Sequence, residues 1–152
     1  MRLDAVAIGV GLAGCSGSGS TGACVAGITL GTGVDAFTPL SDDDPLAIVY
    51  GPQGGYHLPL AVRGCGAVPD AVDSHLTGDD PDGRRVVDLT VAHGWVPVDD
   101  CCADALDLRG YLPDDAVDGL IGAEVSLRIE VVAVDGGGDV GADAVRVRVI
   151  DP

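Results

Sequence analysis

The sequence predicts an all-β protein, an antiparallel sandwich of seven to eight strands. From residue 24 onward, short apolar runs alternate with clusters of Gly, Pro and Asp, as in a strand-rich domain. The 47% apolar content comes largely from Val, Ala and Leu, which suits strands better than a large aromatic-lined cavity. All but two of the 24 acidic residues are Asp. Because Asp competes for the backbone and favours turns, helix is disfavoured and the acids are expected in loops.

The clearest strand pair lies near the end of the chain, where residues 124–134 and 144–150 flank a turn at 135–139. Apolar residues occupy every second position of both segments, which predicts a hairpin with one buried face. Its apolar residues are expected in the core and its arginines in water: Val125, Leu127, Ile129, Val131, Val145, Val147 and Val149 inside, and Arg128, Arg146 and Arg148 outside. Glu130 is expected to pair with an Arg across the hairpin.

The same alternation predicts further strands. The candidates are 24–30, then 46–50 and 56–63 around a turn at 51–55, then 71–76 and 86–92 around a turn at 79–83, and finally 105–112. Pro59 has no backbone N–H, so its strand is expected to be an edge strand or to bulge there. Residues 113–120 are expected to form a short helical turn that opens on Asp114 and Asp115.

The first residues have the features of an export signal. An apolar run at 5–12 ends in Leu12-Ala13-Gly14-Cys15, and a Ser- and Gly-rich stretch follows at 16–22. The run is too short to span a bilayer but long enough for a signal segment. Here the chain resembles bacterial lipoprotein precursors. The resemblance implies cleavage before Cys15, a membrane anchor through acylated Cys15 and a flexible tether, and Ser16 favours the outer membrane.

Two features depart from the lipoprotein pattern. Arg2 is the sole basic residue before the apolar run, and Asp4 places an acid beside it. The alternatives are that residues 5–12 form an ordinary buried strand, or that the true start lies upstream of Met1. Under the lipoprotein interpretation the chain divides into a signal segment (1–14), a lipidated Cys with its tether (15–23) and a β-sandwich domain (24–152).

The expected domain resembles immunoglobulin-like sandwiches in strand number and length. It lacks their Cys…Trp…Cys spacing, so the resemblance is one of architecture. Residues 49–57 are also similar to a segment of small bacterial lipoproteins with such domains. That second resemblance implies no activity.

The cysteines predict two disulfides. With Cys15 lipidated, Cys24, Cys65, Cys101 and Cys102 remain, an even set that an oxidising compartment would pair in one of three ways. A bond between the neighbours Cys101 and Cys102 would strain the backbone. We therefore expect Cys24 and Cys65 each to bridge to one member of that pair. No C-x-x-C spacing is present to indicate a thiolate metal site or a redox site.

The charge balance argues against nucleic acid as a partner. The net charge is −16, with eight Arg and no Lys, so the surface repels polyanions. Asp clusters at 42–44, 79–82, 99–100 and 114–118 offer oxygen ligands for Ca²⁺, but none has EF-hand spacing. His57, His75 and His93 lie on different strand candidates, and their positions do not share one face. We expect solvated turn acids, surface or strand-end histidines, and no bound metal or cofactor.

No catalytic constellation is evident, and we predict that the protein is not an enzyme. The sequence has no G-x-S-x-G, H-E-x-x-H or P-loop motif. Ser74 and His75 are adjacent, so on a strand they point to opposite faces and cannot act as nucleophile and base.

The leading functional hypothesis is an envelope lipoprotein with a structural or protein-interaction role, its protein partner unidentified. A metal-binding envelope protein is the alternative. A carbohydrate-binding module is a third interpretation, which requires at least two of the larger aromatic residues on one exposed face: Tyr50, Tyr56, Tyr111 and Trp95.

Overall fold

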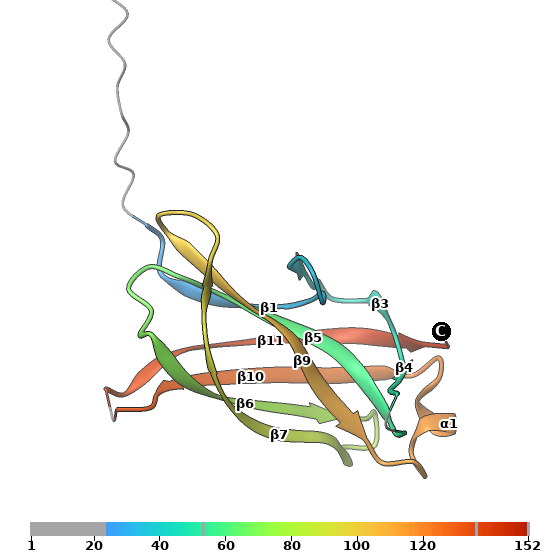
Figure 1. Ribbon diagram of the computed structural model, residues 1–152. Coiled ribbons are helices and arrows are strands. Elements are labelled where there is room, and N and C mark those ends of the chain that lie inside the picture. The colour runs from blue at the N-terminus through green and yellow to red at the C-terminus, as the bar shows by residue number, and fades with distance from the viewer. Residues whose placement is uncertain (1–23, 53, 136, 152) are drawn as a thin grey trace, which may run out of the picture.

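Two β-sheets pack face to face in the computed structural model, which describes residues 24–52, 54–135 and 137–151 (Figure 1). Eleven strands lie in these residues, and eight of them have four residues or more. The inner faces of both sheets supply one continuous apolar core. The predicted all-β sandwich is therefore confirmed.

The first sheet is built around a long central strand, β5. Its order is β2 (Thr38–Pro39), β1 (Gly27–Thr32), β5 (Tyr56–Cys65), β9 (Cys102–Leu112) and β8 (Val96–Pro97), and β4 (Val49–Tyr50) also pairs with β5. All of these pairs are antiparallel.

The second sheet has the order β3 (Asp44–Ala47), β11 (Asp139–Ile150), β10 (Glu124–Ala133), β6 (Ala71–Asp79) and β7 (Arg85–Gly94). One pairing departs from the antiparallel prediction, because β3 runs parallel to β11. A four-residue helix, α1 (Val117–Leu120), confirms a helical turn within 113–120. It begins after Asp114 and Asp115, however, and the acid in its first turn is Asp118. No helix in the described residues is long and apolar enough to cross a membrane.

The β10–β11 hairpin confirms the period-two prediction. The predicted core residues of both strands are buried, and the three arginines face water. Leu127 lies opposite Val145, so the apolar side chains meet in register. The ion pair expected for Glu130 is wrong: it pairs at 2.9 Å with Arg128 of its own strand. Its cross-strand neighbour is Ala142, which carries no charge.

Two strand boundaries also differ from the prediction. The first strand begins at Gly27 rather than at residue 24. The segment 46–50 is divided between the sheets, because β3 joins the second sheet and β4 the first. Ile48 makes the crossing as a buried residue, and its N–H donates to the Ile150 carbonyl at 3.1 Å.

Pro59 sits in a central strand, so the edge-strand prediction is wrong for β5 as a whole. The position is nevertheless a local edge. Pairing with β1 stops at Ala61 and pairing with β4 stops at His57, which leaves Pro59 unpaired on that side. Its missing N–H therefore costs no ladder hydrogen bond there.

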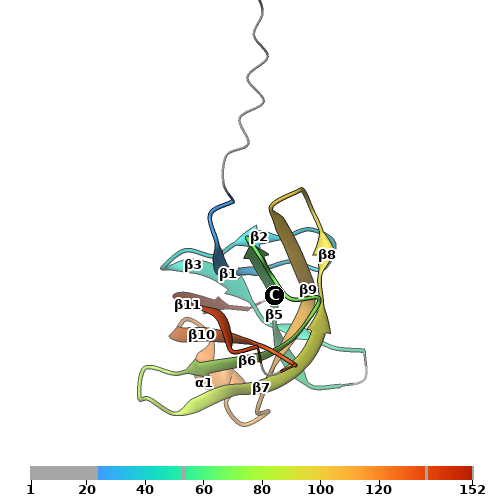
Figure 2. The same ribbon diagram turned by 90° about the vertical axis from the view of Figure 1, so that its left-hand side faces the viewer.

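A further crossing from the second sheet to the first follows β7. After β7 the chain continues through Trp95 into β8, which lies beside β9 (Figure 2). The edges of the two sheets approach each other on this side of the sandwich, where β7 and β9 are in contact.

Candidate functional site

Two disulfides close the end of the sandwich at which the described chain begins (Figure 1). Cys24 is bonded to Cys101 and Cys65 to Cys102, with Cα atoms 5.3 and 4.1 Å apart. The prediction that Cys24 and Cys65 each bridge to one member of the 101–102 pair is confirmed. The predicted lipidation residue, Cys15, and the signal segment lie outside the described residues.

The acidic turn residues bind backbone amides. Asp99 Oδ1 accepts the N–H groups of Cys101 and Cys102 at 2.7 and 2.8 Å, which lowers the pKa of Asp99. In the 79–83 turn, Asp80 Oδ1 accepts from the N–H groups of Asp82 and Arg84. Turn capping of this kind explains why the chain uses Asp rather than Glu.

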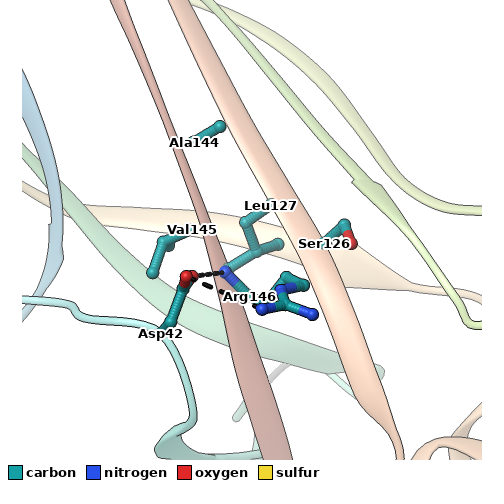
Figure 3. A pocket seen from close by; sticks show the side chains of 6 residues that line it. All are labelled: Asp42, Ser126, Leu127, Ala144, Val145 and Arg146. Carbon is teal, nitrogen blue, oxygen red and sulfur yellow. Dashed lines mark hydrogen bonds and ion pairs between the residues drawn. The ribbon is translucent and has the colours of Figure 1, made fainter.

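The 42–44 turn is likewise bound to a strand. Asp42 Oδ1 accepts the backbone N–H of Arg146 at 2.8 Å, and the Arg146 guanidinium lies 3.8 Å from the other carboxylate oxygen (Figure 3). Beside this pair is a shallow hollow of about 260 Å³, lined also by Ser126 and Ala144. Within the described residues, no group of three or more His, Cys, Asp or Glu side chains is placed to hold a metal ion.

The three histidines occupy separate places. His75 is exposed and lies 3.0 Å from Asp88. His57 is buried, which corrects the expectation of a surface or strand-end residue, and burial lowers its pKa. His93 is half-buried at the end of β7, and burial lowers its pKa as well.

His93 has a partner that the sequence analysis missed. Its Nε2 lies 2.7 Å from Ser74 Oγ and its Nδ1 lies 3.1 Å from the Gly94 carbonyl. In the neutral imidazole that this network assigns, Nδ1–H donates to Gly94 and Nε2 accepts from the Ser74 hydroxyl. Ser74 has 0% of its surface exposed, so no substrate reaches the hydroxyl. The pair satisfies buried polar groups within the sandwich.

The tyrosines are divided between two faces. Tyr50 and Tyr56 are cross-strand partners with ring centroids 5.1 Å apart, whereas Tyr111 is the partner of His57. Because neighbouring positions on β5 point to opposite faces, Tyr111 lies on the other face from Tyr50. These are the two well-exposed rings, at 64% for Tyr50 and 57% for Tyr111. They do not form the single aromatic face that carbohydrate recognition requires.

One side of the sandwich is closed by a direct link between the sheets. We call it the closed side, formed by β1 and β11. The Leu30 N–H donates to Asp143 Oδ2 at 2.7 Å. A Cβ on Gly141 would lie 2.9 Å from Ile28 Cγ1, so the backbone of β11 lies directly against a β1 side chain.

The opposite side, between β7 and β9, carries a groove of about 200 Å³. We call it the open-side groove. Its lining residues are Leu89 and Val91 of β7, and Asp107, Leu108, Arg109 and Tyr111 of β9. Leu89 and Val91 are partly buried against the core, so the groove floor is apolar. Small-molecule sites usually measure about 300–1,000 Å³, so this groove is suited to a few side chains of a protein partner.

A bulge shapes the β9 wall of the groove. Leu60 pairs with Leu108 and Val62 with Ala105, so β9 has two residues opposite Ala61 alone. One of them, Asp107, has a φ of 56° and donates its N–H to the Gly33 carbonyl at 3.2 Å. Beside this loop, the Phe37 ring lies so close to Gly31 that a Cβ there would overlap it.

The polar groups of the groove wall are held in place. Arg109 binds Asp107 through two hydrogen bonds of 3.2 and 2.8 Å. This contact lowers the pKa of Asp107 and raises the pKa of Arg109, so both remain charged. The buried His57 ring lies 6.0 Å from the Tyr111 ring. The exposed Tyr111 side chain therefore packs against a buried residue of β5.

Neither models of known protein families nor curated protein sequences match the chain. The functional argument therefore rests on the groove. Tyr and Arg are enriched among the residues that dominate protein interfaces, and here they stand beside an apolar floor. Local sequence pattern does not reveal the groove, because β7 and β9 become neighbours through the sheet-to-sheet crossing at Trp95.

Proposed function

We propose that the protein is a non-catalytic bacterial envelope lipoprotein, anchored at acylated Cys15, that binds a partner protein through the open-side groove. The groove is the observation that carries the proposal. It combines a well-exposed Tyr111, a fixed Arg109 and an apolar floor, the composition of a protein-binding centre.

Two further observations support an exported, anchored domain. The Leu12-Ala13-Gly14-Cys15 motif matches that of lipoprotein precursors, and the two disulfides suit an oxidising compartment. The described chain begins at the disulfide end, while the groove lies along the side of the sandwich. An anchor at Cys15 thus leaves the groove accessible to a partner in the envelope.

Anchoring and binding are tested together in intact cells of the native host. Mass spectrometry of the full chain should show a mature N-terminus at an acylated Cys15. A photo-crosslinking residue placed at Tyr111 should join the protein to one defined partner. The same residue placed at Tyr50 is the matched control, since Tyr50 is equally exposed on another face.

The crosslinked partner is then purified and its affinity measured directly. Arg109→Ala together with Tyr111→Ala should weaken binding by at least about tenfold, as expected for residues at the centre of an interface. Tyr50→Ala should leave binding unchanged. Equal crosslinking at both tyrosines, or none at Tyr111, would exclude the groove as the binding surface. A free Cys15 with Met1 retained would exclude the anchor.

A further inference from the structure

Within the described residues, positions 87–94 of β7 form a long, regular free edge. The strand ends the second sheet and pairs only with β6 along its ten residues. At the other end of that sheet, β3 has four residues and contains Pro45. In the first sheet, β9 is interrupted by its bulge, and the outermost strands β2 and β8 have two residues each. Natural proteins usually shorten, bulge or cover such edges. The β7 edge has a bulge at Val86, but residues 87–94 pair with β6 without interruption and are not shortened.

The inner side chains of β7 already form the floor of the open-side groove. A strand added at this edge would point every second side chain inward, toward Leu89 and Val91 of β7 and Leu108 of β9. Apolar side chains fit these positions, because the floor is apolar and partly buried.

The outer side chains of β7 face a different environment. Asp88 lies on the outer face with 61% of its side chain exposed, beside Thr90 and Ala92. The whole chain carries a net charge of −16. A basic segment is therefore attracted, whereas a second copy of this chain is repelled by its equal negative charge.

The geometry points to strand addition: the β7 edge accepts an extended segment of a basic partner protein. Apolar side chains at alternate positions of that segment enter the open-side groove, and Lys or Arg between them faces Asp88. This inference rests on the proposed function, because it assumes that the groove is the binding surface, and it adds the partner's conformation and charge.

The probe is the labelled peptide Lys-Val-Lys-Val-Lys-Val-Lys, titrated into the full disulfide-bonded protein. A fully N-methylated version keeps the charge but cannot pair with a strand. Its affinity should be at least about tenfold lower, because main-chain hydrogen bonds supply affinity in strand addition. Residue-resolved amide exchange should show new protection in β7, and raising the salt from about 0.05 to about 0.5 M should weaken binding.

Charge reversal provides the matched variants. Asp88→Arg should weaken binding of the lysine peptide by about tenfold and favour the corresponding Glu-Val peptide. Asp114→Arg makes the same change in net charge at an exposed residue in the segment before α1, and should have little effect. Because both residues are exposed, these variants are expected to fold.

The outcomes separate the inference from the proposed function. Equal binding of the methylated peptide would overturn strand addition and leave the groove as a surface for other contacts. No peptide binding, with crosslinking at Tyr111 intact, would overturn the basic-segment inference alone. Self-association that protects the β7 amides would replace the basic partner with a second copy. Peptide binding with selective protection of β7 supports the inference.

Discussion

The two sides of the sandwich differ in the contacts that join the edges of the two sheets. On the closed side, the Asp143 carboxylate binds the Leu30 amide and Gly141 lets β11 lie directly against Ile28. On the open side, no hydrogen bond joins the described residues of β7 and β9, although a Cβ on Gly110 of β9 would lie 3.2 Å from Val87 Cγ1 of β7. A groove with an apolar floor lies between the two strands. A polar link satisfies an edge amide within the chain, whereas an unlinked edge keeps its amides available for another chain. The backbone amides available to a partner are therefore those of the β7 edge.

Removing a disulfide is expected to change the free energy of unfolding most. The Cys65–Cys102 bond is the informative one, because it joins the β9 wall of the open side to β5. Removing it as Cys65→Ala with Cys102→Ala should lower the free energy of unfolding by about 4 kcal/mol, since it closes a loop of 37 residues. Denaturant unfolding measures this loss. Amide exchange should then show β9 losing protection while β11 keeps it. Equal losses in both strands would show that the two sides do not behave independently.

The Asp143 link should give the next largest effect. Asp143→Ala leaves the Leu30 amide without its acceptor, which should cost about 1.5–3 kcal/mol of unfolding free energy. Asp42→Ala is an informative comparison, because Asp42 also accepts a backbone amide but at an exposed turn. If Asp143→Ala proves no more costly than Asp42→Ala, the link does not distinguish the closed side.

Steric tolerance should also differ between the sides. Gly141→Val brings a side chain against Ile28 and is expected to cost about 1–3 kcal/mol, the range for overpacked sites. Val91→Ile adds one carbon beside the open groove and should change stability by less than about 0.5 kcal/mol. Ala142→Val, exposed on the same strand as Gly141, serves as the local control. Similar costs for Gly141→Val and Val91→Ile in chemical denaturation would contradict the comparison.

Acid should weaken the open side first, and this is the smallest expected effect. His57 beneath Tyr111 and His93 at the end of β7 have pKa values lowered by burial, whereas β1 and β11 contain no His. The unfolded chain then binds more protons, so stability is complete above about pH 6.5 and falls as the pH drops from there toward the folded pKa values. The carboxylates of Asp99 and Asp107 act in the same direction, at lower pH.

Thermal unfolding between about pH 7.5 and pH 5 tests this effect. His93→Gln should flatten the dependence, because it removes a buried group that must gain a proton in acid. A wild-type profile that is flat across this range would contradict the assignment to buried histidines.

Local pattern was sufficient to predict most strands, two hairpins and the disulfide partners. The β10–β11 hairpin follows from its alternation. The strain of a vicinal bond excludes Cys101–Cys102, but it does not decide which of these two cysteines pairs with Cys24 and which with Cys65. The Ser74–His93 contact was also within reach, because the β6–β7 register places Val91 opposite Ser74 and His93 diagonally beside it.

The groove and the parallel β3–β11 pair could not be predicted from local sequence pattern. Both depend on which strands from distant parts of the chain become neighbours. The crossing at Ile48 sends β3 and β4 to different sheets, and the crossing at Trp95 brings the β7 and β9 edges together. The burial of His57 has the same origin, since alternation on β5 alone assigned it to the exposed face.

Residue-resolved amide exchange of the free protein tests the open edge most directly. In an edge strand every second N–H points away from its one partner, so slow and fast amides should alternate along β7. The amides of β6, which is paired on both sides, should all exchange slowly, as should the Leu30 amide bound to Asp143. Uninterrupted slow exchange along β7 would show that its edge is covered and would contradict the account of an open, partner-binding side.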